Sequence, residues 1–238
     1  MTSLVQPVRV FVDPLEGTRT AVEAHRWVWP LLILALCVSA SGTLFSLRWD
    51  AAPDVIRQLQ GMGQLAGMSE ADLTDNIQTA TRKALVGGIA KGVFVMPLLT
   101  LLLACALWMV GWLFDQKASF ERLLSAAALA MLPIALYHLI FTLCAAAQHT
   151  LTEARAEQLV PSHLGAVLTG LSPKMARLAS TVDFFNLWSA CLLGLGFSAA
   201  TGMRRSRAVA LALVLYVMYA GVTMVGLPAV VVVGGGPR

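Results

Sequence analysis

Long apolar stretches without any charged residue constrain most strongly what this chain can fold into. Five such stretches occur, each at least 20 residues long: Trp27–Leu47, Val93–Leu113, Leu123–Ala147, Phe184–Met203 and Ala208–Val233. About 20 apolar residues in a helix cross the hydrocarbon core of a bilayer, and only helices or closed barrels satisfy the backbone there. The sequence therefore predicts an all-α, polytopic membrane bundle with about five transmembrane helices.

The composition agrees with a surface that faces lipid. Only 13% of the 238 residues are charged and 58% are hydrophobic, whereas soluble domains carry about 25% charged residues. We therefore expect one membrane domain over residues 27–233, preceded by a segment of residues 1–26 and followed by a short tail of residues 234–238. The first stretch is longer than a signal-peptide core and follows a polar leader, so we expect a span and not a cleaved signal.

Basic residues in the connections predict the orientation. With the N-terminus in the cytoplasm, eight of the 17 Lys and Arg residues fall inside: Arg9, Arg19, Arg26, Lys117, Arg122, Arg204, Arg205 and Arg207. Positive charge favours the cytoplasmic side, so we expect a multi-pass protein of the cell inner membrane, with its N-terminus cytoplasmic and its C-terminus outside. The basic residues form no stripe with aromatics, which argues against nucleic acid as a partner.

The two long connections expected outside show helical patterns. In the first, apolar residues recur at helical spacing at Val55, Ile56, Leu59 and Met62. Ser69 then fits a helix start, and the next apolar face can run directly into the second span through Leu73, Ile77, Ala80 and Ala84. In the second connection, Ser172 and Pro173 precede a similar stripe over residues 175–182. We expect amphipathic helices that lie on the bundle or among lipid headgroups; a docking surface for a protein is the alternative.

His138 is the only ionisable side chain well inside the five stretches. Such residues are functional candidates by default because they are costly in lipid. A neutral imidazole can also be satisfied by one interhelical hydrogen bond, worth about 0.6–2 kcal/mol, and we favour this structural role. Asn186, an intramembrane polar residue of the fourth stretch, is a candidate partner, as are Ser189 and Thr142. Proton or ligand chemistry at His138 is the alternative.

The sequence lacks the motifs that carry catalysis or metal binding. Its four cysteines lie in different apolar stretches and form no CxxC pair: Cys37, Cys105, Cys144 and Cys191. There is no HExxH, GxSxG or phosphate-binding loop, and no Asp or Glu lies inside any stretch. We therefore predict no catalytic, metal-binding or cofactor-binding residues and no cofactor, and we do not expect an enzyme.

Small residues indicate close helix packing. Ala84, Gly88 and Gly92 recur every four residues and so share one helix face, while Gly194 and Gly196 lie in the fourth stretch. Glycine costs about 1 kcal/mol in a helix interior, so we expect a compensating close approach of another helix. That helix belongs either to the same bundle or to a partner subunit.

Four short segments, distributed in order along most of the chain, carry a further signal. They are Val8–Pro14, which ends in Asp-Pro; Arg26–Leu32, where Trp and Pro enter the first span; Ser119–Leu124; and Phe184–Trp188. They resemble the leader, the first span, the short inner loop and the fourth-span entry of the Yip (Ypt-interacting protein) family, in its bacterial branch. The third span resembles the family's in bearing a proline, Pro133, which should bend it.

The resemblance implies five spans with a cytoplasmic N-terminus, which agrees with the count of apolar stretches. The Asp-Leu-Tyr-Gly-Pro motif of eukaryotic members is missing, so no small-GTPase role is implied. Some bacterial relatives are thought to assist a neighbouring ABC-type exporter, which makes exporter subunits the candidate partner.

We predict a non-enzymatic accessory or scaffold protein that assembles with or stabilises a membrane complex of the bacterial cytoplasmic membrane. Its partners would be membrane lipids and a membrane protein, with ABC-type exporter subunits as the candidate from the resemblance. A small transporter or channel is the alternative, but a path through the bundle has only His138, Asn186 and scattered Ser and Thr to line it.

Overall fold

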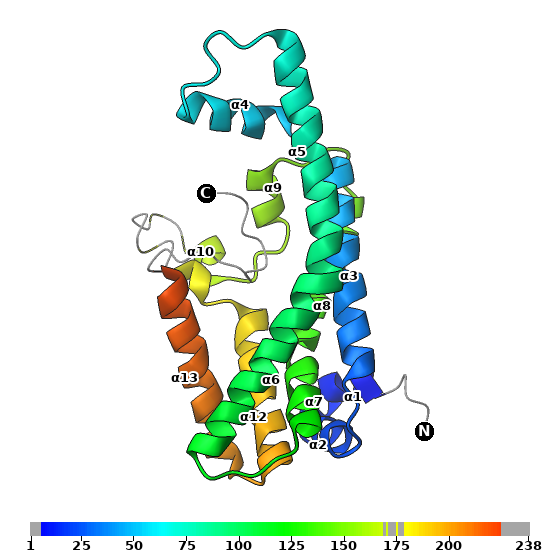
Figure 1. Ribbon diagram of the computed structural model, residues 1–238, viewed down its shortest axis with the longest axis vertical. Coiled ribbons are helices and arrows are strands. Elements are labelled where there is room, and N and C mark those ends of the chain that lie inside the picture. Colours follow the sequence, from blue (N-terminus) through cyan, green and yellow to red (C-terminus); the bar gives the residue numbers. More distant parts are fainter. Residues whose placement is uncertain (1–5, 169, 171–174, 176–178, 225–238) are drawn as a thin grey trace.

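The computed structural model describes residues 6–168, 170, 175 and 179–224 of the chain. These residues form helices, turns and two isolated bridges, and they contain no strand. Four of their helices are long and apolar enough to cross a membrane: Val28–Arg48, Glu70–Leu113, Phe120–Ala146 and Phe184–Thr201. The expected fold class, an all-α polytopic membrane bundle, is confirmed (Figure 1).

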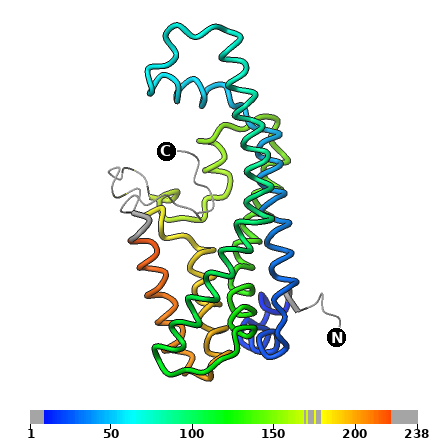
Figure 2. The backbone as a smooth tube through the Cα atoms, in the orientation of Figure 1, coloured from blue at the N-terminus to red at the C-terminus, as the bar shows by residue number. Residues whose placement is uncertain are grey.

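The elements follow one another along an elongated bundle, whose path is traced in Figure 2. They are α1 (Gln6–Val12), α2 (Pro14–Glu23), α3 (Val28–Arg48), α4 (Ala52–Gly61), α5 (Glu70–Ala90), the π-helix η1 (Lys91–Val95), α6 (Met96–Leu113), α7 (Phe120–Ala130), α8 (Leu132–Ala146), α9 (Glu153–Gln158), α10 (Leu164–Val167), α12 (Phe184–Thr201) and α13 (Arg205–Met224). The fifth expected stretch begins in α13, and its residues beyond 224 lie outside the described part. The helix start expected at Ser172 and Pro173 lies outside it as well.

The third span forms the centre of the bundle and is broken in two. α7 ends at Ala130 and α8 begins at Leu132, with Pro133 in the first turn of α8. Proline lacks an N–H donor and clashes with the preceding turn, so the helix is interrupted at the position where a bend is predicted. Of the most apolar 18 residues of the third span, 67% are buried, whereas the buried share of the corresponding residues is 22% in the first span and 22% in the second. The third span is therefore the core, and those two lie at the periphery.

The second span is part of a single long rod. α5, η1 and α6 continue from Glu70 to Leu113 over 44 residues. At 1.5 Å per residue the rod is about 66 Å long, roughly twice the hydrocarbon thickness of a bilayer. Ser69 caps the rod by accepting the N–H of Asp72 at 3.1 Å. The prediction that a helix starting here runs directly into the second span is confirmed.

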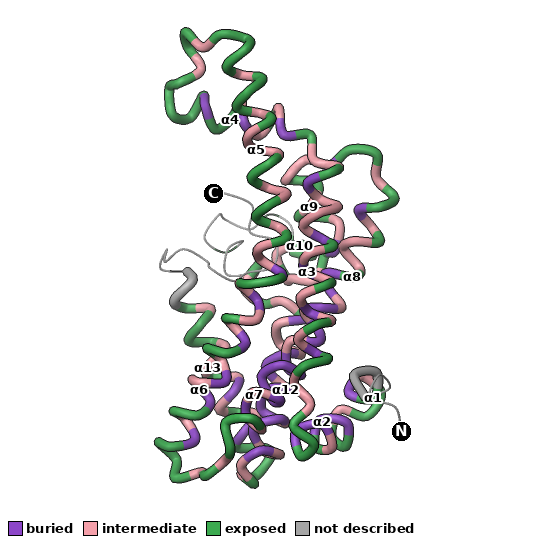
Figure 3. The backbone as a smooth tube through the Cα atoms, turned by 45° about the vertical axis from the view of Figure 1, so that its right-hand side comes forward, coloured by how far each residue is buried: buried purple, intermediate pink, exposed green. Residues whose placement is uncertain are grey.

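The excess length of the rod carries a helical arm. We define the arm as residues 52–80, α4 with the first part of α5, which project beyond the other helices (Figures 1 and 3). Val55 and Leu59 of the predicted apolar face are buried against α5. Met62, expected on the same face, is exposed because the chain leaves the helix at the end of α4. The arm thus has a small hydrophobic core of its own.

One carboxylate fastens the base of the arm to the connection between α8 and α12. Asp54 accepts the indole N–H of Trp49 at 2.9 Å and the backbone N–H of Glu153 at 3.3 Å. Only 8% of its side chain is exposed, and hydrogen bonds to a charged group are the stronger kind. Beside it, the N–H of Asp50 donates to the carbonyl of Leu151 at 2.8 Å. We call these contacts the anchor.

The N-terminal segment is folded and packs on the bundle. α1 and α2 form a hairpin whose buried residues join the main hydrophobic cluster with α7 and α12: Val10, Ala21 and Val22. The Asp-Pro pair has a local role, because Asp13 caps α2 by accepting a backbone N–H at 3.2 Å and Pro14 occupies the first turn. This polar leader therefore contributes apolar side chains to the core.

Glu153 allows a pH test of the anchor. Burial raises the pKa of its carboxyl group, and the neighbouring Asp54 carboxylate raises it further. A carboxyl whose folded-state pKa exceeds its unfolded value stabilises the fold when protonated, and this contribution is lost as the pH rises through the folded-state pKa. We therefore expect the anchor to open more readily at neutral than at mildly acidic pH, and Glu153→Gln to reduce that difference.

Hydrogen exchange of residues 151–158 measures this opening, once the rates are corrected for their intrinsic pH dependence. The comparison runs from about pH 7.5 to about pH 4.5, so that it includes the range just above the ordinary Glu pKa of about 4.3. Asp75→Asn, an exposed position on α5, is the control and should behave as the unchanged chain. An identical pH dependence in Glu153→Gln would contradict the role of this carboxyl group.

Candidate functional site

α3 and α5 touch backbone to backbone along one seam. A Cβ atom on Gly88 would lie 2.8 Å from the Cα of Gly42, a distance that real Cβ atoms essentially never show. One turn along, a Cβ on Gly92 would collide with Ser39. Two positions of the predicted small-residue face therefore contact a helix of the same chain, as close helix packing in lipid requires. Ala84, one turn before Gly88, is half-buried.

A π-helical turn places a lysine beside this seam. η1 interrupts the α-helical ladder at Lys91, and such turns are frequent at functional sites. Because Gly88 and Gly92 face Gly42 and Ser39, the intervening Lys91 lies level with the middle of α3. Its side chain is half-buried.

Lys91 lies just before the predicted second span, in the same continuous helix. The uninterrupted apolar stretch starts at Val93, so composition alone leaves Lys91 just outside it. The structure continues the second span through η1 into α5, which packs on α3.

His138 is buried between α8 and α3. Its Nδ1 lies 2.6 Å from Oγ of Ser41, and only 7% of the residue is exposed. The Ser41 hydroxyl donates to the carbonyl of Val38 at 2.9 Å. Donor and acceptor in this pair depend on the imidazole tautomer: a hydroxyl that keeps its bond to Val38 accepts from Nδ1–H, and with the other tautomer the hydroxyl donates to Nδ1. Nε2 is buried and has no hydrogen-bond partner among the described residues.

The expected partners of the imidazole lie elsewhere. Thr142 donates its hydroxyl to the backbone carbonyl of His138 at 2.7 Å, within α8. Ser189 is buried without a hydrogen-bond partner among the described residues. Asn186 lies in the first turn of α12, where Asp183 accepts its backbone N–H at 3.0 Å. The interhelical hydrogen bond of His138 is present, but its partner is Ser41, which sequence reasoning missed.

Ser39, Ser41, Lys91 and His138 together form what we call the polar cluster. It joins α3, η1 and α8, and Ser39 adds a bond to the carbonyl of Ile89 at 3.4 Å. The cluster has no carboxylate to pair with its bases, and no group of three His, Cys, Asp or Glu side chains in the described part of the chain could hold a metal ion. Its chemistry fits a polar contact that fixes the register of three helical segments.

The seam predicts a contrast between neighbouring glycines. Gly88→Ala places a methyl group against the backbone of α3 and should destabilise the purified chain by about 1–3 kcal/mol, as overpacked contacts do. Gly87→Ala is the matched control, because a Cβ there meets nothing within 4 Å. It should be neutral or stabilising by up to about 1 kcal/mol. Thermal unfolding in mild detergent measures both, and equal melting temperatures would contradict the seam.

The pairing of His138 with Ser41 predicts an energetic coupling. Ser41→Ala and His138→Leu should each destabilise the chain, and the double variant should reveal a coupling of about 0.6–2 kcal/mol. His138→Asn should retain more stability than His138→Leu, because its amide can occupy the position of Nδ1. Denaturation of the detergent-solubilised variants measures these differences.

Ser46→Ala is the control for this cycle. Ser46 is buried on the same helix, but its hydroxyl donates to the carbonyl of Gly42 within α3, at 2.8 Å. It should show no coupling to His138→Leu. If the His138 variants keep normal stability and all lose cellular function, the imidazole carries proton or ligand chemistry and the structural role is wrong.

The comparison with known families agrees with this architecture. The Yip1 domain family matches residues 8–227, which include the hairpin, the arm, the seam and the polar cluster. No curated protein and no solved structure gives a match to the chain. The resemblance to the Yip family is confirmed, since the match covers nearly the whole chain. With its apolar helices, this chain belongs to the Yip1 domain family of membrane proteins.

Proposed function

We propose that the chain is a non-enzymatic accessory protein of the bacterial cytoplasmic membrane. It assembles with a partner membrane complex and stabilises it, and an ABC-type exporter is the first partner to test. In this role the bundle holds the protein in the membrane, and the arm and the outer face of α6 are the surfaces for contact with the partner.

The arm is the observation that carries this proposal. It projects beyond the bundle, and its apolar side chains are covered by one another rather than by the other spans. Ordering about 30 residues outside the bundle costs conformational entropy, and the arm gives the bundle little packing in return. The anchor nevertheless holds its base in one place. A fixed projection of this kind is suited to contact another protein.

Within the membrane, the outer face of α6 offers a second surface that supports the proposal. Large apolar side chains on this helix are more than half exposed: Leu98, Leu102, Met109 and Leu113. The bundle does not need this face for its own closure, because the third span already forms the core. In the proposed complex, helices of the partner replace part of the lipid here.

The charge distribution supports the proposed orientation. Residues 1–26, 114–122 and 202–207 hold eight Lys and Arg against five Asp and Glu. The described parts of these segments, residues 6–26, 114–122 and 202–207, lie together at the end of the molecule opposite the arm, which we call the basic end (Figure 1). Since positive charge favours the cytoplasmic side, the proposal puts the basic end in the cytoplasm and the arm outside.

Co-purification with an arm variant tests the proposed function. The full-length chain, tagged and produced at its native level, should recover an exporter subunit in comparable amount from mild detergent. Met62→Glu changes an exposed residue at the end of α4 and should reduce that recovery several-fold without lowering the melting temperature. Val12→Glu, an exposed apolar residue at the basic end, is the matched control and should recover the partner normally.

Two outcomes would contradict the proposal. A chain that purifies alone and moves solute after reconstitution into liposomes would be a transporter or channel in its own right, and the polar cluster would be the place to look for its path. Equal recovery of the partner with Met62→Glu and with Val12→Glu would remove the arm from the interface.

A further inference from the structure

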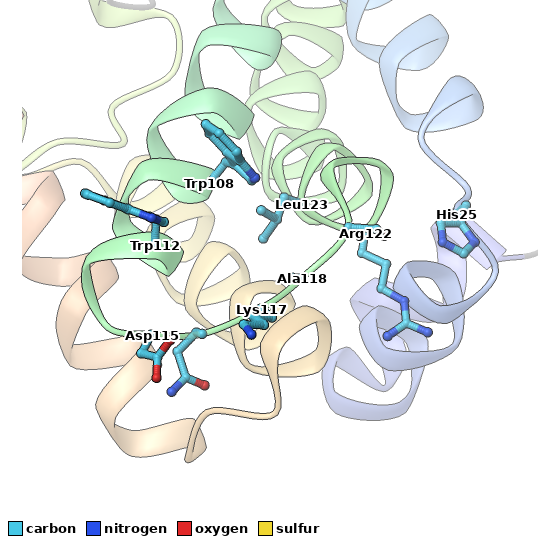
Figure 4. A pocket seen from close by; sticks show the side chains of 10 residues that line it. His25, Trp108, Trp112, Asp115, Lys117, Ala118, Arg122 and Leu123 are labelled. Atoms are coloured by element: carbon cyan, nitrogen blue, oxygen red, sulfur yellow. The ribbon is translucent and has the colours of Figure 1, made fainter.

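A pocket of about 610 Å³ opens at the basic end, between the end of α6 and the start of α7 (Figure 4). Its volume lies in the range of small-molecule binding sites. α6 and the connection to α7 line it, and His25 reaches it from the connection between α2 and α3. Segments far apart in the sequence thus meet around one hollow, to which neither the fold nor the proposed function assigns a role.

Two tryptophans of α6 indicate the depth of this pocket in a membrane. Trp108 is 54% exposed and Trp112 is 82% exposed, and their spacing of four residues puts them on one helix face. A large aromatic ring exposed to this degree is unfavourable in water. At the level of the lipid headgroups it is favourable, because the ring is apolar and its N–H can still find an acceptor.

Lys117 and Arg122 bring two cations to the same pocket. Neither forms an ion pair with an acidic side chain of the described residues. The nearby acids are Asp115, which also lines the pocket, and Glu121, whose carboxylate lies 4.0 Å from Nε2 of His25. The cations therefore remain available to an anion, within an end of the molecule that has an excess of positive charge.

We propose that this pocket binds the phosphate headgroup of an anionic phospholipid. Lys117 and Arg122 pair with the phosphate oxygens, and the guanidinium can do so through two parallel hydrogen bonds. The acyl chains run along the exposed apolar face of α6 past Trp108, where Leu101 is also exposed. This continuity between a cationic pocket and an apolar helix face favours a lipid over a soluble phosphate compound.

Native mass spectrometry of the delipidated full-length chain tests the proposal. The protein is titrated in detergent with equal amounts of phosphatidylglycerol and phosphatidylcholine that carry identical acyl chains. We expect phosphatidylglycerol to bind preferentially, and each cation removed by Lys117→Gln or Arg122→Gln to weaken its binding roughly fivefold, the effect of one basic residue near an anionic lipid surface. Lys117→Arg keeps the charge and should keep the preference, which separates loss of charge from loss of fold.

Arg19→Gln is the matched control, because Arg19 is an exposed cation of the same end that pairs with Glu23 and does not line the pocket. It should leave the preference unchanged. Three results would overturn the proposal: a double Lys117→Gln and Arg122→Gln variant that retains the preference, an equal loss in Arg19→Gln, or displacement of the lipid by an equal concentration of inorganic phosphate. The last result would assign the pocket to a soluble anion.

Discussion

The close approach of α3 and α5 is the contact on which the rest of this structure depends. Between helices in lipid there is little hydrophobic driving force, so association relies on tight packing and on interhelical hydrogen bonds. Gly42 and Gly88 supply the packing by removing every side-chain atom between the two backbones. That single register brings Lys91 level with the middle of α3. Because α3 also packs on α8, the same helix holds Ser41 against His138.

The register of the seam also explains why the molecule has an arm. The rod of α5, η1 and α6 is far longer than α3, and the seam fixes how the two helices are aligned. The N-terminal part of α5 therefore passes beyond the end of α3, where α4 is the element that covers its apolar face. Asp54 then holds the base of this projection through Trp49 and the start of α9. The difference in length between the rod and α3 thus produces the arm that projects from the molecule.

Close backbone approach is used again at the other end of the bundle. A Cβ on Gly196 would lie 2.7 Å from the Cβ of Ala126, so α12 and α7 are in direct contact, and Gly194 allows the same approach to α13. The N-terminal hairpin closes this end, with Phe11 packed edge-on against Trp188 at 5.4 Å between ring centroids. The basic residues and the pocket beside α6 therefore lie at an end of the bundle where the helices are closely packed.

The sequence by itself determined the features that depend on neighbours along the chain. The apolar stretches indicated the membrane class, Ser69 a helix start and Pro133 the break in the third span, because each acts on its own backbone. The small-residue face showed that a helix contact was needed, but not which helix would make it. Only the tertiary structure decided that α3 makes it, that Ser41 is the partner of His138, that Lys91 belongs within the bundle and that the polar leader folds onto α12. These facts depend on which helix faces meet. The periodicity of a helix shows which of its faces must be covered, but it does not show which other helix covers that face.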